Sequence, residues 1–329
     1  MYQGKAVKKL DLANLPTRIQ KLEWVSRQTG KNVWIKRDDH TGLEYSGNKI
    51  RKLEYALAQA LELGCDTIVT AGGIQSNHCR ATAAACARLG LRCVLVLSSD
   101  EKQSLDGNYL LDVLFGARIR FISSQKYKSS LSQMLDLVVD ELKADSKKPY
   151  VIPVGASNGI GTYGYFSAMT EIVEQENEMD QIFDTIVATV GSGGTYAGLA
   201  LANQALGLGK EIIGFNICDD KAYFEQKIQK ISQEFMGIYG VFPFETKDIK
   251  IIDGYVGRGY ALSDAIELDF IQQFAKREGI ILDPTYTGKA MRGLVTELIE
   301  NHPLLSKSEN ILFIHTGGIF GLFPKRFQF

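Results

Sequence analysis

Two short segments of this 329-residue chain carry residue types that could do chemistry together. Lys49 lies in the run Ser-Gly-Asn-Lys-Ile-Arg-Lys, residues 46–52, where a loop is expected to become a helix. A cation at a helix N-terminus meets the positive end of the dipole, which lowers the pKa of the amine. Such an amine is a nucleophile toward carbonyl groups. Lys52 lies one turn further, and the two cations repel unless an anion such as a phosphate lies between them.

The second segment is a glycine-rich loop between an expected strand, 185–190, and an expected helix, 196–206. Glycines let backbone N–H groups close on an anion, and the following helix adds its dipole. The spacing is neither G-x-G-x-x-G nor a Walker loop, which favours one terminal phosphate over a dinucleotide or nucleoside triphosphate. The expected cradle consists of Gly191, Ser192, Gly193, Gly194 and Thr195. A lysine that can form an imine, together with this cradle, predicts an enzyme that holds pyridoxal phosphate (PLP) covalently.

A third segment, Gly-Gly-Ile-Gln-Ser-Asn-His at 72–78, also follows an expected strand. Ser76 is a natural helix N-cap, which is the structural interpretation. Alternatively, exposed N–H groups here hold a substrate carboxylate, and the Ser76 hydroxyl faces the reacting carbon. Asn77 could hydrogen-bond a ring hydroxyl of the cofactor. His78 is either a satisfied surface histidine or a proton donor near the site.

Two tyrosines in loops are candidates for the substrate pocket. Tyr260 lies in a glycine-rich loop at 256–260, and Tyr286 follows the turn signal Asp-Pro at 283–284. A buried tyrosine normally packs its ring and finds one hydrogen bond, and most of the 14 tyrosines are expected to do only that. The last loop at the expected sheet edge, 316–318, begins with Thr316.

Bulk properties exclude several functional classes. The net charge of −1 provides no electrostatic footprint for nucleic acid or an anionic membrane. No apolar run approaches the roughly 20 residues of a membrane span, and residues 1–15 lack the apolar core of a signal peptide. The five cysteines form no C-x-x-C pair, and the four histidines have no metal-ligand spacing, so no metal site is expected. These features favour a cytoplasmic protein.

Strand, glycine-rich turn and helix recur along the chain, which predicts an α/β protein with parallel sheets and helices on both faces. Strands are expected at 33–37, 67–70, 93–97, 119–122, 150–152, 185–190, 212–217 and 311–315. Helices are expected at 49–63, 77–89, 108–115, 131–144, 160–175, 196–206, 222–234, 264–278 and 289–300. Ligands of such sheets bind at the carboxyl ends of the strands, and the segments 71–78, 189–195 and 316–318 each follow an expected strand. Loop-like seams predict a large domain, 1–47 plus 162–329, and a smaller inserted domain, 48–161.

The chain resembles the PLP enzymes of the tryptophan synthase β-type fold, specifically the branch of D-cysteine desulfhydrase and 1-aminocyclopropane-1-carboxylate (ACC) deaminase. The resemblance covers nearly the whole chain. It rests on four motifs, which are Lys-Arg-Asp-Asp at 36–39, Gly-Asn-Lys-Ile-Arg-Lys-Leu-Glu at 47–54, the segment 72–78 and Asp-Pro-Thr-Tyr-Thr-Gly-Lys at 283–289. It implies fold type II, with PLP in a cleft between two three-layer αβα domains of mostly parallel, twisted sheets, and a homodimer.

The resemblance also implies roles for individual residues. Lys49 matches the Schiff-base lysine, and Lys52 with the loop 191–195 matches the phosphate binders. Asn77 matches the partner of the ring hydroxyl, and Ser76 matches the catalytic serine near the substrate carboxylate, beside His78. The remaining matches are Tyr260 and Tyr286 as active-site tyrosines, Thr287 facing the pyridine nitrogen, and Thr316 in the final cofactor loop.

Within the branch, three positions favour the desulfhydrase. ACC deaminases have a glutamate beside the pyridine nitrogen, where this chain has neutral Thr287, a weaker electron sink. They have glutamine at the position of His78 and leucine at the position of Thr316. Elimination of a thiolate tolerates a weaker sink, because the leaving group takes the electrons. We therefore expect a carbon–sulfur lyase that converts D-cysteine to pyruvate, hydrogen sulfide and ammonia.

Alternatives remain open at this point. The nearest is ACC deaminase activity, which yields 2-oxobutyrate and ammonia, followed by elimination from another β-substituted amino acid. A non-catalytic PLP carrier is a third. From a different class, a nucleotide-binding oxidoreductase requires the loop at 191 to hold a pyrophosphate and leaves Lys49 without a role.

Overall fold

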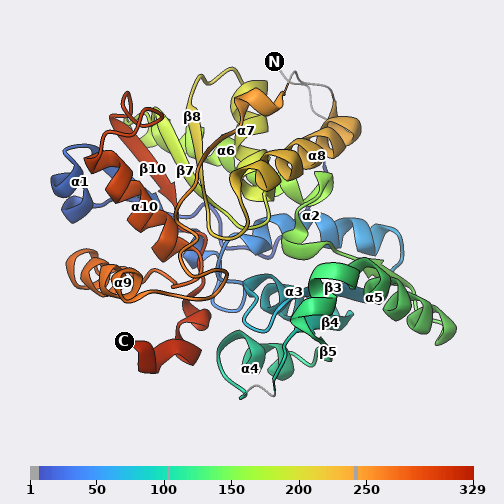
Figure 1. The fold of residues 1–329 in the computed structure, drawn as a ribbon. Coiled ribbons are helices and arrows are strands. Elements are labelled where there is room, and N and C mark those ends of the chain that lie inside the picture. Colours follow the sequence, from blue (N-terminus) through green and yellow to red (C-terminus); the bar gives the residue numbers. More distant parts are fainter. Residues whose placement is uncertain (1–6, 102–103, 241–243) are drawn as a thin grey trace.

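The computed structural model describes residues 7–101, 104–240 and 244–329 as two sheets with helices on both faces of each (Figure 1). The larger sheet has the order β1-β2-β10-β7-β8-β9, and the smaller has the order β5-β4-β3-β6. Only β1 is antiparallel to its neighbour, and all other strand pairs are parallel. The predicted α/β class with mostly parallel sheets is confirmed.

The strands of the larger sheet are β1 (Ile19–Lys21), β2 (Asn32–Lys36), β10 (Asn310–Ile314), β7 (Thr185–Val190), β8 (Glu211–Asn216) and β9 (Lys250–Ile252). One face is covered by α6 (Gly159–Met179), α7 (Gly194–Ala205) and α8 (Lys221–Tyr239). The other is covered by α1 (Glu23–Thr29), α9 (Ala265–Glu278) and α10 (Thr287–Ile299). All six residues of β7 are buried, as expected for a central parallel strand covered on both sides.

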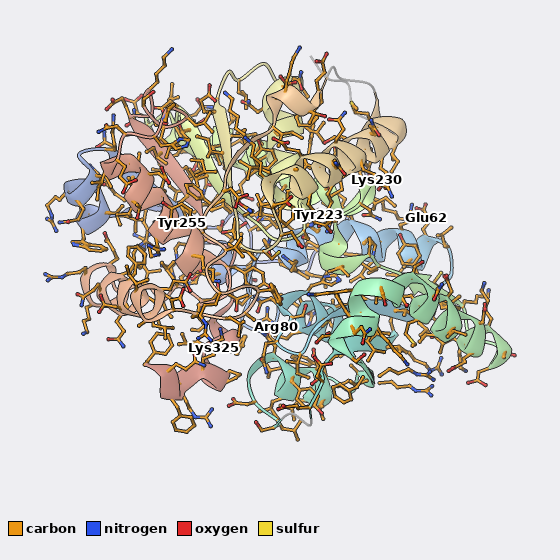
Figure 2. The ribbon with its side chains drawn as sticks, in the orientation of Figure 1. Glu62, Arg80, Tyr223, Lys230, Tyr255 and Lys325 are labelled. Carbon is orange, nitrogen blue, oxygen red and sulfur yellow. The ribbon has the colours of Figure 1, made fainter. Side chains whose placement is uncertain are left out.

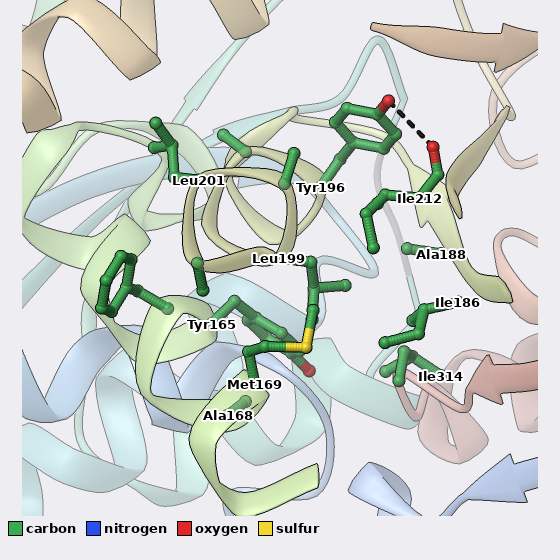
Figure 3. Close-up of a cluster of buried hydrophobic side chains, with 14 of the residues drawn as sticks. Tyr165, Ala168, Met169, Ile186, Ala188, Tyr196, Leu199, Leu201, Ile212 and Ile314 are labelled. Carbon is green, nitrogen blue, oxygen red and sulfur yellow. Dashed lines mark hydrogen bonds between the residues drawn. The ribbon is translucent and has the colours of Figure 1, made fainter. Parts of the chain in front are cut away.

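Figure 3 shows the packing on the first of these faces. Met169 of α6 and Leu199 of α7 meet Ile186 of β7, and all three are fully buried. The only polar group of this cluster drawn with a partner is the Tyr196 hydroxyl, which donates to the carbonyl of Ile212 at 3.1 Å. A buried phenol needs such an acceptor, so this bond fixes α7 against β8.

The strands of the smaller sheet are β5 (Arg118–Ile122), β4 (Arg92–Ser98), β3 (Thr67–Gly73) and β6 (Pro149–Val151). Ile68 and Leu95 point to the face packed by α2 (Lys49–Glu62) and α3 (Asn77–Leu89), with α4 (Gly107–Leu114) beside them. Val69 and Val94 point to the opposite face, which α5 (Ser124–Ala144) covers. Side chains alternate across a strand, so the apolar runs of β3 and β4 serve both faces. The predicted three-layer αβα arrangement is confirmed for both sheets.

The structure adds elements that the sequence pattern did not indicate. Strands β1 and β9 have only three residues each, and α1 has seven, so their periodicity is too short to detect. Helix α5 begins seven residues before the expected 131, and Ser130 interrupts it with φ −144° and ψ 19°. Single-turn 3-10 helices occur at η1 (Asp38–His40), η2 (Val154–Ala156), η3 (Thr246–Asp248) and η4 (Ile319–Gly321), and a longer one at η5 (Phe323–Gln328).

A buried ion network joins α2 to the larger sheet. Arg51 donates to Asp38 from Nε at 2.9 Å and from Nη2 at 2.8 Å, and to Glu171 of α6 at 2.8 Å. Arg51 and Asp38 are 2% and 0% exposed, so solvent does not screen the pair. This network fixes the first turn of α2, which carries both Lys49 and Lys52.

The exact domain seams at 47/48 and 161/162 stay predictions. Among the helices of residues 7–101, 104–240 and 244–329, none is long and apolar enough to cross a membrane.

Candidate active site

Lys49 is the first residue of α2, and Asn48 precedes it without capping the helix through its side chain. The Lys49 ammonium donates to the Asn48 side-chain oxygen at 2.8 Å and has no carboxylate within ion-pair distance in the described chain. Burial, opposed by Asp283 and reinforced by the cation of Arg80, lowers the pKa of Lys49 to about 8. The direction agrees with the sequence argument, but burial is its main cause.

Lys52 is a buried amine with no carboxylate at ion-pair distance in the described residues. Its side chain is fully buried and donates to the carbonyl of Gly155 at 2.6 Å and to the hydroxyl of Ser157 at 2.7 Å. Burial and then the neighbouring cations Lys49 and Lys227 lower its pKa well below the ordinary value. Buried charges in proteins are normally paired. A buried amine that has further cations near it and no carboxylate at ion-pair distance in the described residues is suited to bind an anionic group.

The predicted glycine cradle lies directly against Lys52. Helix α7 begins at Gly194, and Gly193, with φ 87°, provides no side-chain cap. A Cβ on Gly194 would lie 2.6 Å from the Lys52 amine and 2.8 Å from the Ser157 hydroxyl, so only glycine leaves this space open. A helix N-terminus whose N-cap residue is glycine, with a lysine amine and a serine hydroxyl beside it, fits a phosphate group. These residues therefore fit pyridoxal phosphate.

Hydroxyl groups complete this cradle. Ser157 donates to Ser192 at 2.8 Å and accepts from the backbone N–H of Gly194 at 3.3 Å. Thr195 accepts from the side-chain amide of Asn48 at 2.9 Å, which links the cradle to the residue before Lys49. The sequence prediction missed Ser157 and Asn48. Asn48 lies inside a quoted motif, whereas Ser157 had only the weak signal of a loop after β6.

The segment at the start of α3 is arranged as predicted. Ser76 is the N-cap, and its hydroxyl oxygen accepts from the N–H of Cys79 at 3.2 Å. The Asn77 side-chain oxygen accepts from the amide of Asn108 at 2.9 Å, which leaves the Asn77 amide N–H₂ group without a hydrogen bond in the described chain. The capping interpretation of Ser76 thus holds, and it does not consume the hydroxyl proton.

His78 is buried, not a surface histidine, with 2% exposure. The Thr70 hydroxyl donates to the carbonyl of Ile152 at 2.7 Å, so it accepts from His78 Nε2 at 2.8 Å. Nδ1 then bears the lone pair, and it is buried with no hydrogen-bond partner among the described residues. Burial and the cations Lys49 and Lys52 keep the pKa of His78 well below its ordinary value, so the ring is neutral.

The two predicted tyrosines meet each other. Their hydroxyl groups lie 2.5 Å apart, and the rings pack edge-on with centroids 5.9 Å apart. A Cβ on Gly73 would lie 3.4 Å from the Tyr260 ring, and a Cβ on Gly191 would lie 3.4 Å from the Tyr286 ring. The tyrosine pair therefore connects the loop after β3 of the smaller sheet to the loop after β7 of the larger sheet.

Thr287 is fully buried at the start of α10 and bonded to Asp283, a residue whose role the sequence did not predict. The Thr287 hydroxyl donates to Asp283 Oδ1 at 2.8 Å and accepts from the Asp283 N–H at 2.9 Å. Asp283 also accepts backbone N–H bonds from Thr285, Tyr286 and Thr287. The hydroxyl of the neutral threonine is thus hydrogen-bonded directly to a carboxylate. Thr316 contacts the residue before Lys49, since the Thr316 carbonyl accepts from the N–H of Asn48 at 3.2 Å.

The structure brings the predicted site residues to one region, where loops at the carboxyl ends of β3, β7 and β10 meet the start of α2. Two cavities, of about 480 and 530 Å³, lie elsewhere and are not lined by Lys49, Ser76 or Tyr286. In the described part of the chain, no group of three or more His, Cys, Asp or Glu side chains could hold a metal ion.

The chain is similar to known proteins over most of its length. A match to the family described as pyridoxal-phosphate dependent enzyme spans residues 10–317. The bifunctional D-cysteine desulfhydrase/1-aminocyclopropane-1-carboxylate deaminase of Arabidopsis thaliana is 44% identical over 323 residues, which are 95% of this chain and 79% of that protein. The D-cysteine desulfhydrase of Serratia proteamaculans is 39% identical over an alignment that includes 96% of this chain and 95% of that protein.

A solved structure gives the same result for the fold. The crystal structure of an ACC deaminase homologue matches with a TM-score of 0.88 at 38% identity, and it covers 98% of this chain and 95% of that chain. These matches leave the nucleotide-binding oxidoreductase alternative without support. The amines of Lys49 and Lys52 and the glycine cradle are consistent with the cofactor of the matched family. The chain belongs to the pyridoxal-phosphate-dependent enzymes, in their fold type II branch.

Proposed function

We propose that this protein is a D-cysteine desulfhydrase, which takes D-cysteine and water to pyruvate, hydrogen sulfide and ammonia. The observation that carries the proposal is the buried amine of Lys52, which has no carboxylate at ion-pair distance in the described residues and lies beside the start of α7, with Lys49 one turn away on α2. The names of the two relatives support the choice of reaction, since both include D-cysteine desulfhydrase activity.

In this proposal the cofactor is held at both ends. Lys52 and the loop 191–195 hold the phosphate, and Lys49 forms the covalent link. Asn77 would donate its amide to the ring hydroxyl, Thr287 would lie at the ring nitrogen, and Thr316 would also contact the cofactor. Once bound, pyridoxal phosphate supplies an electron sink for the carbanion at the α-carbon of an amino acid.

The chain's own groups then handle protons and orientation. The Lys49 amine, with a pKa of about 8, is partly neutral near neutral pH and can accept the α-proton of the substrate. The N–H groups at the start of α3 and the Ser76 hydroxyl orient the substrate carboxylate. His78 stays neutral beneath this segment and contributes an acceptor.

In this proposal the tyrosine pair protonates the leaving sulfur. Burial and the neighbouring Tyr260 raise the pKa of Tyr286 well above the ordinary value, so its phenol keeps its proton at neutral pH. Its hydroxyl is hydrogen-bonded to that of Tyr260, and Tyr260 is 43% exposed. A proton given up by one phenol can therefore be replaced through the other.

ACC deaminase activity is the second candidate, and one observation favours it. The sequence argument against it rested on a neutral Thr287 near the ring nitrogen. The Asp283 carboxylate accepts the Thr287 hydroxyl proton at 2.8 Å, so negative charge lies one hydrogen bond behind that position. A carboxylate there stabilises a protonated ring nitrogen and strengthens the electron sink. The name of the Arabidopsis relative carries both activities.

The test begins with a spectrum of the purified protein and continues with D-cysteine, L-cysteine and ACC as separate substrates. Sulfide and pyruvate from D-cysteine support the proposal, and 2-oxobutyrate from ACC supports the second candidate. Related β-substituted amino acids, such as chloroalanine, complete the panel. Protein that carries the chromophore but acts on none of these substrates is a carrier, which refutes the enzymatic proposal.

The variant Lys49→Ala tests the central residue, with Lys230→Ala as its matched control. Lys230 is an exposed lysine on α8 that makes no ion pair in the described chain (Figure 2). Lys49→Ala is expected to abolish turnover and leave any bound cofactor without a covalent link, whereas Lys230→Ala behaves as wild type. Normal sulfide release by Lys49→Ala refutes its role.

We also propose a cytoplasmic homodimer. Support for the location is that all five cysteines are free, which fits a reducing compartment, although the Arabidopsis relative is named as mitochondrial. Support for association is the number of large apolar side chains left exposed, among them Leu43, Leu114 and Phe327 at 75%, 68% and 88%. Light scattering with size-exclusion chromatography measures the mass, and a monomer of 36.4 kDa contradicts the dimer.

A further inference from the structure

The loop that carries Tyr260 needs support from outside itself. No helix or strand occurs between the end of β9 at Ile252 and the start of α9 at Ala265. The residues on both sides of Tyr260 have positive φ, 126° at Gly259 and 57° at Ala261. A non-glycine residue in this region is strained, and it persists only where the surroundings hold it.

Two lysines hold the carbonyls on either side of Tyr260. Lys289 of α10 donates to the carbonyl of Gly259 at 3.0 Å, and Lys325 of η5 donates to the carbonyl of Ala261 at 2.5 Å and to the Ser263 hydroxyl at 3.3 Å. Lys289 also has a carboxylate, Glu267, at 3.8 Å. Lys325 makes no ion pair in the described chain, so its ammonium serves the loop alone.

Lys325 belongs to the last part of the chain, residues 319–328, which we call the C-terminal strap. In Figure 1 the strap lies below α9 and beside α4. Its next residue, Arg326, forms an ion pair with Asp106 at the start of α4. A Cβ on Gly107 would lie 2.5 Å from the carbonyl oxygen of Phe320, so backbone meets backbone there. The strap therefore contacts both halves of the molecule.

Helix α4, which the strap contacts, in turn contacts the segment of Ser76 and Asn77 on the opposite side of the candidate site. Asn108 of α4 donates to the side-chain oxygen of Asn77 at 2.9 Å and to the carbonyl of Gln75 at 2.9 Å. Arg80, one turn into α3, lies 4.9 Å over the ring of Phe320 in the strap (Figure 2 labels Arg80 and Lys325). The strap thus spans from the Tyr260 loop to the segment of Ser76 and Asn77.

The Tyr260 loop is not held by close packing on every side. A cavity of about 480 Å³ borders the Tyr260 loop and is lined by Arg258, Ala261, Leu262, Ser263, Leu268 and Gln328. Space on one side of a loop leaves hydrogen bonds, not a packed core, to set its position. The loop can move toward the cavity once the bond from Lys325 is removed.

We propose that the C-terminal strap fixes Tyr260 relative to Ser76 and Asn77, with Lys325 as the positioning residue. The structural part of this inference depends only on the contacts above. Its catalytic consequence rests on the proposed function of Tyr260. Misplacing a reacting group by about 1 Å can cost roughly 100-fold in rate, so the strap has a measurable effect on turnover.

The experiment compares Lys325→Met with Lys325→Arg and the control Lys307→Met, an exposed lysine that makes no ion pair in the described chain. Hydrogen–deuterium exchange reports the loop directly, with or without substrate. Lys325→Met is expected to speed exchange of amides 256–263, whereas Lys325→Arg, which keeps a cationic donor, restores part of the protection. Unchanged exchange in Lys325→Met overturns the inference.

Kinetics then test positioning. For D-cysteine, kcat/KM of Lys325→Met is expected to fall roughly 10- to 100-fold, with cofactor content unchanged. Faster exchange with unchanged kcat/KM overturns the positioning role. If wild type does not act on D-cysteine, the proposed function has failed, and the exchange result still decides the structural part.

Arg326→Gln tests the contact of the C-terminal strap with α4, since the 54% exposed Arg326 side chain tolerates change. This variant is expected to speed exchange in 319–328, and no change there also counts against the strap.

Discussion

Replacing Lys52 by methionine is expected to have opposite effects on the apoprotein and on cofactor binding. The side chain is fully buried, and its charged neighbours Lys49 and Lys227 are also cations. Methionine keeps much of the aliphatic volume and removes the charge. In the apoprotein, Lys52→Met loses hydrogen bonds to Gly155 and Ser157, each worth about 1 kcal/mol net.

The charge itself dominates this balance. Burying an ion without a partner costs several kcal/mol, so its removal offsets the lost bonds. We expect the free energy of unfolding of the apoprotein to stay the same or rise by about 1 to 3 kcal/mol. With the cofactor, the same lysine pairs with the phosphate, and truncating one member of such a pair costs about 2 to 5 kcal/mol. The dissociation constant for pyridoxal phosphate should therefore rise by roughly 30-fold or more.

The assay uses apoprotein prepared with hydroxylamine. Urea unfolding gives the stability, and titration with pyridoxal phosphate followed by fluorescence gives the dissociation constant. Lys230→Met, an exposed lysine on α8, is the control and should change neither quantity. A Lys52→Met apoprotein that is destabilised by several kcal/mol while binding the cofactor normally would refute the reasoning.

Three further predictions follow from the same contacts. Gly194→Ala places a methyl group 2.6 Å from the Lys52 amine and should weaken cofactor binding at least about tenfold, whereas Gly237→Ala, with open space around its Cβ, should stabilise α8 by about 0.5 to 1 kcal/mol. Arg51→Met leaves the Asp38 carboxylate buried and unpaired and should destabilise the protein by about 3 to 5 kcal/mol in urea unfolding, with partial recovery on adding Asp38→Asn. Because the folded pKa of Lys49 is lowered to about 8, the unfolded state binds more protons between about pH 8 and 10.5, so apoprotein stability should rise with pH there by about 3 kcal/mol relative to Lys49→Met. A flat difference between these two proteins in urea melts from pH 7 to 10.5 would contradict that pKa.

Local signals allowed much of the fold to be predicted. Helix α3 and strand β7 have the bounds expected, Asn77–Leu89 and Thr185–Val190. For α3 the reason is a serine N-cap at one end and Gly90 with φ 69° at the other. For β7 it is a short apolar run bounded by a glycine turn. Strands β1 and β9, of three residues each, contain no full period and were missed, whereas the equally short β6 was expected at 150–152.

Site residues divide in the same way. Lys49, Ser76 and the loop 191–195 could be named because each lies at a loop-to-helix junction that the sequence itself displays. The Asp283 carboxylate behind Thr287 was missed, although the two are only four residues apart, because nothing local shows which way the hydroxyl points. That bond changes the comparison between the two candidate reactions.

The sequence by itself determined the alternating strands and helices, the chemical types in each loop and therefore the class of cofactor. Caps, glycine turns and apolar periods act over a few residues, so they are readable from the chain. The tertiary structure decided which groups share a site, since Lys52 meets Ser157 across 105 positions and Lys325 meets the Ala261 carbonyl across 64. It also decided the pKa of Lys49, because burial, the largest cause, arises only when distant segments exclude water from one amine.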